Sequence, residues 1–512
     1  MVSKATKILL FTTVICSSYL HAIGQEVMAQ ESILGIAQQR EQASSQNNPP
    51  PRRNTTTKIE DATQLLENTP KDYGSKISTR PQYVKGLKKL KSRDNTTIPP
   101  KKSTATLPNQ PRENLASAAP GLPPISQPVR KKIIETDPYA PDGINVGNIN
   151  VLPYVGVAGG YNTNPSSAAK AKGSALYQVE GGLSANSDWS NHAFNADLRG
   201  IYTDYTGVRG ANQPEVNARV GGRIDVTKDT KIDLETRAKL STESVSDISL
   251  PVGVTQRPNI YAYGASLGGS QRYGNTILSL RGSVDRFTYD PATAATNIID
   301  QSDRDQNTYA LRLRAGYEVS PGITPFVDTI TDTRQFDKTL DRNGVRRSSN
   351  GLAGRVGTSF EITRTLTGEV AIGYGSREFD DKRLKKLDGL VSEANLVWSL
   401  SPLTAIRLKA SSDLQDTTGL GATGVKANKI GIDVEHALLR NLKLGAFVEY
   451  ENDKSQNTFQ FQNIYNFGLK ADYKLTKEIV FRTGYTFQKV TASYAGGNYN
   501  SSQILFGLRL QR

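Results

Sequence analysis

Few side chains of this chain have the types and spacing that catalysis needs. Its 512 residues include three histidines and one cysteine. His192 and His436 lie far apart, and His21 lies in an N-terminal segment that we expect to be removed. Metal sites of the His/Cys kind need several such ligands at short, characteristic spacings, and no phosphate-binding loop motif occurs. We therefore predict a protein without enzymatic activity, metal or cofactor.

The carboxylates offer two further candidate sites. Asp233 and Glu235 share one face of an extended segment, as an acid/base pair would, but Arg237 and Lys239 continue that face. A charged wall is therefore the favoured interpretation. The pair Asp380-Asp381 could bind a divalent cation, although we favour a solvated loop.

The elements that carry these charges alternate strictly between apolar and polar residues. From residue 309 to 319 every odd position is apolar, while Arg312, Arg314 and Glu318 fall between them. Because successive side chains of a strand point to opposite faces, this pattern predicts a strand between an apolar and a polar medium. The same pattern recurs at 232–240, 406–410, 442–450 and 481–488.

The length and rhythm of these segments distinguish a membrane barrel from a soluble sandwich, which would also alternate. The segments run about 10 to 13 residues, longer than the ~5–6 of soluble sheets and close to a tilted transmembrane strand. Short and long connections alternate, with both ends of the pattern at the short-turn rim. We predict an all-β, transmembrane antiparallel barrel of about eighteen strands, beginning near residues 149, 175, 192, 215, 231, 259, 275, 307, 322, 351, 365, 391, 403, 428, 441, 463, 478 and 501.

The first 136 residues differ from the rest. Residues 1–29 have the pattern of a secretory signal peptide, with cleavage between Ala29 and Gln30. Residues 30–136 are rich in Pro and carry 18 basic and 9 acidic side chains, so most of the chain's net charge of +14 lies there. Such a composition buries too little apolar surface to fold. We predict a disordered, basic periplasmic segment, with residues 137–512 as the barrel.

A family resemblance accompanies this pattern. The sequences Asp137-Pro138-Tyr139-Ala140-Pro141-Asp142-Gly143-Ile144 and Gly160-Tyr161-Asn162-Thr163-Asn164-Pro165 resemble the start of the putative β-barrel porin 2 family. The resemblance covers residues 137–512. It implies an outer-membrane barrel of a Gram-negative bacterium, and some members are associated with exopolysaccharide export. Outer-membrane lipids and the barrel-assembly machinery are then the expected partners. Ile504, Phe506, Leu508 and Leu510 alternate in the last strand, but the chain ends on Arg512 rather than on the aromatic residue of many such barrels.

We predict a passive, weakly selective channel for small solutes, with possible homo-oligomers and no nucleic-acid partner. An exporter or anchor for an anionic polysaccharide and a structural or host-contact surface protein are the alternatives. On the predicted inner face of the strands beginning near 215, 231, 307 and 403, eight basic residues outnumber five acidic ones. This excess predicts a weak anion preference. Each charge could instead pair with a neighbouring strand and brace the wall. The candidate pore-lining residues are Arg219, Arg223, Asp233, Glu235, Arg237, Lys239, Arg312, Arg314, Glu318, Arg355, Arg377, Arg407, Lys409 and Arg482.

Overall fold

The computed structural model describes residues 138–170, 172–245, 247, 249–250, 253–294, 297–362, 365–419 and 421–512. The predicted signal peptide, with its cleavage site at Ala29 and Gln30, and the predicted basic segment lie outside these residues. Residues 363–364 lie outside them as well. None of the helices in the described part of the chain is long and apolar enough to span a membrane.

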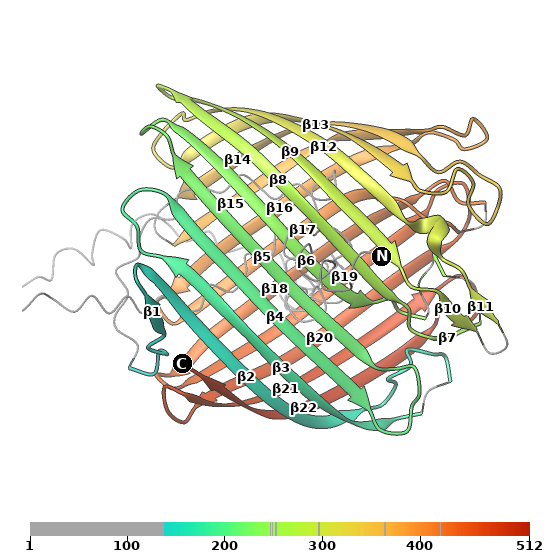
Figure 1. The fold of residues 1–512 in the computed structure, drawn as a ribbon, viewed down its shortest axis with the longest axis horizontal. Helices are drawn as coiled ribbons and strands as arrows, with labels where there is room; N and C mark the ends of the chain where they lie inside the picture. The colour runs from blue at the N-terminus through green and yellow to red at the C-terminus, as the bar shows by residue number, and fades with distance from the viewer. Residues whose placement is uncertain are drawn as a thin grey trace, which may run out of the picture. The chain divides into compact units, whose positions relative to one another are not determined.

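The predicted eighteen-stranded antiparallel barrel is confirmed (Figure 1). Each strand pairs with its neighbours along the chain, and the last strand pairs with the first through Tyr154 to Asn162. The largest difference in a strand's start is at β16, which begins at Leu387 against the predicted 391. The strands are β2 (Ile149–Asn162), β3 (Ser174–Ser187), β4 (Ala193–Tyr205), β5 (Gln213–Asp225), β6 (Thr230–Thr242), β8 (Asn259–Tyr273), β9 (Thr276–Tyr289), β12 (Gln306–Tyr317), β13 (Ile323–Phe336), β14 (Ser349–Ile362), β15 (Leu366–Phe379), β16 (Leu387–Ser401), β17 (Thr404–Gln415), β18 (Val425–Leu439), β19 (Leu442–Ser455), β20 (Phe461–Lys474), β21 (Ile479–Ala492) and β22 (Tyr499–Gln511).

Short additional elements lie at the two rims. β1 (Ile144–Val146) pairs with the start of β2 at the short-turn rim. At the long-loop rim, β7 (Val254–Gln256), β10 (Ala292–Ala294) and β11 (Ile298–Ile299) form a separate three-stranded sheet (Figure 1). The 3-10 helix η4 (Ser302–Arg304) follows in the same loop as β10 and β11. The sequence pattern predicts these regions only as polar loops.

Tight turns close the short-turn rim. In the turn between β5 and β6, the Thr230 N–H donates to the Thr227 hydroxyl at 2.9 Å. Gly274 and Gly322 have φ values of 59° and 84° in two other turns, a conformation that costs glycine least. The Arg512 N–H donates to the carbonyl of Pro153 at 3.1 Å, which places the end of the barrel beside the beginning of β2 at this rim.

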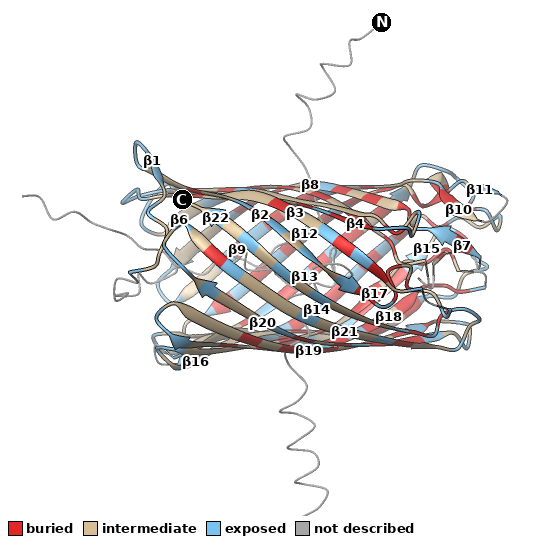
Figure 2. Ribbon diagram, turned by 90° about the horizontal axis from the view of Figure 1, so that it is seen from below, coloured by how far each residue is buried: buried red, intermediate tan, exposed pale blue. Residues whose placement is uncertain are grey.

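Burial alternates along the strands as the sequence pattern predicts (Figure 2). On β12, Leu311 and Leu313 are 46% and 55% exposed, whereas Arg312 and Arg314 between them are 1% and 7% exposed. In a closed barrel the exposed positions face outward and the buried ones inward. The barrel therefore has an apolar outer surface and a charged inner surface.

Candidate transport lumen

Part of the inner wall is organised around a carboxylate on β13. Asp328 is 1% exposed. It accepts hydrogen bonds from Arg312 Nη2 at 2.5 Å and Arg314 Nη2 at 2.7 Å, both on β12, and from Arg355 Nε at 2.9 Å on β14. Three guanidinium groups from the two flanking strands thus converge on one acidic side chain. Alternation places all four residues on the inward face.

Two further carboxylates extend this cluster around the wall. Arg314 also donates to Glu369 on β15 at 2.7 and 2.8 Å, and its guanidinium lies 3.6 Å from the ring centroid of Phe326. Arg355 donates to Glu393 on β16 at 2.9 Å. The network therefore links five strands, β12 to β16, through charge-assisted hydrogen bonds.

A second group lies closer to the long-loop rim. Arg377 on β15 donates to Asp332 on β13 at 2.5 Å. Arg334 forms an ion pair with the same Asp332 at 3.4 Å and another with Asp416 in the loop after β17. These contacts connect β13 and β15 to a loop that begins on a more distant strand.

Ion pairs also link β5, β6 and β9 in the wall formed by β5, β6, β8 and β9. Arg219 Nη2 lies 2.5 Å from Glu235, and Arg237 lies 2.9 Å from Asp285 and 3.5 Å from Glu235. Lys239 is buried on the same inward face of β6. Asp233 lies 3.7 Å from an arginine of β9 and is therefore held in the same network.

Other pairs lie nearer the short-turn rim, where the side chains are more exposed. Arg223 contacts Asp225 at 3.0 Å, and Glu318, just beyond β12, pairs with Arg272. These pairs are partly accessible to solvent. Their contribution to stability is accordingly small.

The opposite wall, β17 to β22, has the same character. Arg407 contacts Asp433 and Glu435, each at 2.7 Å, and Lys443 reaches Glu435 at 2.9 Å. Lys409 is buried on the inward face two residues after Arg407. Ion pairs thus recur around the whole circumference of the barrel.

Arg482 on β21 joins the last strands to the first. It contacts Glu180 on β3 at 2.6 Å and Asp472 on β20 at 3.2 Å. The structure therefore places every predicted pore-lining residue on the inward face or, for Glu318, at its edge. Asp328 and Glu369, which hold much of the network together, are absent from the predicted set. On β13 the outward residues are mostly threonines, which weakens the alternation around Asp328.

The possible catalytic and cation-binding motifs do not have the geometry that those roles need. Ser266 lies in a Gly-x-Ser-x-Gly sequence, residues 264–268, but hydrolases need that motif on an exposed strand-to-helix turn. Here it lies in the middle of β8 and the serine is 2% exposed. Asp381, one of the two candidate cation ligands, accepts hydrogen bonds from Arg383 instead. Among the described residues no group of three His, Cys, Asp or Glu side chains could hold a metal ion.

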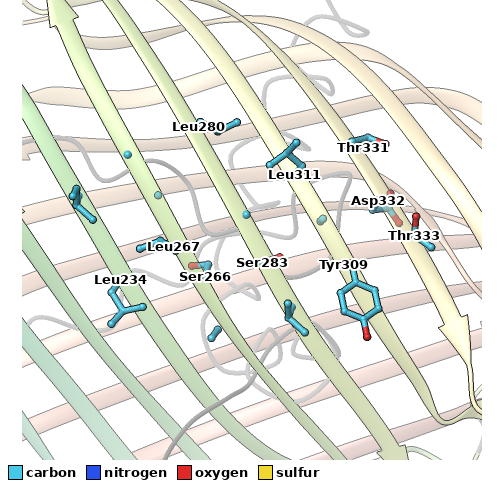
Figure 3. Close-up of a pocket in the computed structure, with 17 residues that line it drawn as sticks. Leu234, Ser266, Leu267, Leu280, Ser283, Tyr309, Leu311, Thr331, Asp332 and Thr333 are labelled. Atoms are coloured by element: carbon cyan, nitrogen blue, oxygen red, sulfur yellow. The ribbon is translucent and has the colours of Figure 1, made fainter.

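A shallow hollow of about 830 Å³ lies in the outer wall over β6, β8, β9, β12 and β13 (Figure 3). Gly282 stands directly between Leu267 and Leu311 on the adjacent strands, so the apolar surface dips there. Among the described residues of the lining, Asp332 is the one with a charged side chain, and its carboxylate is bound by Arg377. The hollow therefore belongs to the apolar outer surface rather than to the charged lumen.

The closed barrel with its apolar exterior defines an outer-membrane β-barrel protein. Residues 137–512 match the model of the family described as Putative beta-barrel porin 2, and the chain belongs to that family.

Among solved structures, a variant of the ferric enterobactin receptor PfeA from Pseudomonas aeruginosa is similar, with 8% identity, 71% of this chain and 80% of that chain covered, and a TM-score of 0.35. The siderophore receptor PirA from Acinetobacter baumannii shares 8% identity over 72% of this chain and 81% of its own, with a TM-score of 0.36. The ferric-catecholate import receptor Fiu from E. coli K12 shares 10% identity over 70% and 81%, with a TM-score of 0.34. No curated protein matches the chain.

Proposed function

We propose that this protein is a passive channel for small solutes across the outer membrane, with a weak preference for anions. The observation that carries the proposal is the inward-facing charge network inside a closed, eighteen-stranded wall. Barrels of roughly this size enclose an aqueous channel unless something fills it. In the proposed orientation the long-loop rim faces outside the cell, and residues 30–136 lie in the periplasm. The role requires no catalytic group.

The pairing of the charges sets the expected strength of the selectivity. Arg312, Arg314 and Arg407 each lie within ion-pair distance of at least one carboxylate. A paired cation attracts a passing anion less than an isolated one, because its partner's field opposes its own. The preference should therefore be weak, and it should fade with salt as the Debye length falls from ~10 Å at 0.1 M to ~3 Å at 1 M.

The test is the reversal potential of the reconstituted protein in a salt gradient. Changing Arg312, Arg314, Arg407 and Lys409 together to Gln removes four positive charges and leaves Arg355 as the cation that pairs with Asp328 among the described residues. We expect the reversal potential to shift toward cation preference.

The matched control replaces the three arginines with Lys, which keeps the charge but loses the paired N–H donors of guanidinium. This variant should keep the sign of the wild-type potential. Conduction with an unchanged reversal potential in the Gln variant would show that these four side chains do not set the ion preference. An absence of conduction in every folded variant would contradict the channel itself.

A further inference from the structure

The loop between β6 and β8 contacts the far side of the barrel. The hydroxyl of Ser249 lies 3.3 Å from that of Thr417, and the Thr418 hydroxyl donates to the carbonyl of Ser249 at 3.4 Å. Thr417 and Thr418 belong to the loop between β17 and β18. From β6 to β17 is eight strands in one direction around the wall and ten in the other. Ser249 therefore bridges the mouth at the long-loop rim.

The root of this bridging loop is fixed at its first residues. Glu243 accepts hydrogen bonds from Arg304 at 2.6 and 2.8 Å, and both side chains are buried. The Arg304 guanidinium lies 4.1 Å from the ring centroid of Tyr289. Burial alone would lower the pKa of Arg304, but the carboxylate of Glu243 raises it above its ordinary value, so the pair stays charged. The Glu243 N–H also donates to the carbonyl of Pro258 at 2.9 Å and closes the base of the loop.

Apolar packing holds the loop next to Ser249. Leu250, Val254 and Ala292 form a buried cluster against which Val245 and Ile299 pack. The cluster lies on β7, β10 and β11 and the residues beside them, at the long-loop rim. Burial of three apolar side chains there favours one defined loop conformation.

The loop between β17 and β18, which Ser249 contacts, is also held by hydrogen bonds. Arg347 Nη1 donates to the carbonyl of Ala422 at 2.8 Å, and Asn343 Nδ2 donates to the carbonyl of Thr418 at 3.0 Å. Leu414, at the end of β17, packs in a buried cluster with Leu387 and Val391 of β16. The loop that receives Ser249 is therefore anchored to the loop between β13 and β14 and to the inner wall.

We infer that Ser249 and Thr417 form the constriction of the channel and set the largest solute that it admits. This inference rests on the proposed channel function. The groups that meet at the bridge are hydroxyls and a carbonyl. Carboxylates stand beside them, because Asp247 Oδ1 accepts a hydrogen bond from the Ser249 N–H at 2.8 Å and Asp416, which precedes Thr417, pairs with Arg334. The bridge between Ser249 and Thr417 selects solutes by their size and admits small polar ones. The paired charges of the inner wall below it act weakly on ions.

Two variants, each with Cys16→Ser, test the inference. In the first, Ser249→Cys with Thr417→Cys places two thiols at a contact short enough for a disulfide after a small adjustment. Oxidation should join the loops, as a gel shift or intact mass would show, while either single variant should not cross-link. The solute cut-off of the oxidised protein should equal that of the wild type.

In the second variant a Gly-Gly link replaces residues 247–252, so that the loop can no longer span the mouth. We expect the single-channel conductance to rise roughly twofold or more, towards that of an unobstructed lumen of this strand number, and larger polyethylene glycols to enter. The control is the same kind of shortening at 382–385, in a loop of the same rim where Arg383 contacts the neighbouring Gly344. That control should keep the wild-type cut-off.

The outcomes separate this inference from the channel proposal. A conducting wild type whose cut-off survives the 247–252 replacement keeps the channel and overturns the constriction, as does failure of the double cysteine variant to cross-link. A silent wild type with a conducting shortened variant supports the constriction as the element that closes the path. Silence in both overturns both proposals.

Discussion

Removing the carboxylate of Asp328 should be far more damaging than removing a carboxylate at the rim. Asp328→Asn leaves Arg312, Arg314 and Arg355 around a neutral amide at a site that is 1% exposed. Arg314 keeps Glu369, but Asp328 is the ion-pair partner of Arg312 among the described residues. Breaking one partner of a buried ion pair costs about 3–5 kcal/mol.

The matched control is Asp225→Asn. Its partner Arg223 has a side chain that is 32% exposed, and pairs of that kind are worth roughly 0–1 kcal/mol. Both variants can be compared by urea unfolding in lipid vesicles, followed by the fluorescence of Trp189 and Trp398. Adding Arg312→Gln to Asp328→Asn should recover part of the loss, because the unpaired cation is then gone. Equal losses from the two single variants would refute the central role of Asp328.

Three further predictions concern the faces, the loops and the tail. Leu313→Arg puts a charge on the outer surface and should cost about 2–4 kcal/mol of stability in vesicles, whereas the inward Thr486→Arg should cost much less; equal costs would mean that the register is wrong. Burial tends to raise the pKa of Asp303, but hydrogen bonds from Arg342 outweigh it and hold that pKa below its ordinary value. The contribution of the Asp303–Arg342 pair to stability is then complete above about pH 4, the pKa of Asp in the unfolded chain, and is lost as pH falls further. Hydrogen exchange in loop 337–348 should therefore speed up below about pH 4. A change confined to pH 6–8 would contradict this origin. Protease added to intact cells should spare residues 30–136 and should remove them after permeabilisation; cleavage in intact cells would reverse the proposed orientation.

The barrel itself could be predicted because alternation is a local property of the sequence. Leu311 and Leu313 alternate with Arg312 and Arg314, so the sequence of this one strand reveals both of its faces without knowledge of its neighbours. Strand ends are less certain. β16 starts at Leu387, in a stretch whose polar and glycine residues look like loop.

The partners of the charges could not be predicted in the same way. Arg314 reaches Glu369 across β13 and β14, a contact that depends on strand register and on the length of the arginine side chain. The sequence allows two interpretations, a lining of separate charges or pairs that brace the wall, and the structure shows pairs. Asp328 does not stand out in the sequence because the outward residues beside it on β13 are mostly threonines rather than leucines.

The bridge at Ser249 is the least predictable feature. It joins loops that are 168 residues apart in the chain, and it depends on a buried ion pair and an apolar cluster that assemble only in the folded rim. From composition alone these loops are polar connections.

Ion conduction by the purified full-length protein in a planar lipid bilayer tests the central claim most directly. Both the wild type and the 247–252 variant should give discrete current steps. Their reversal potential in a salt gradient should indicate a slight anion preference at 0.1 M, and this preference should approach zero at 1 M. A folded, inserted barrel that passes no current in either form would contradict the account.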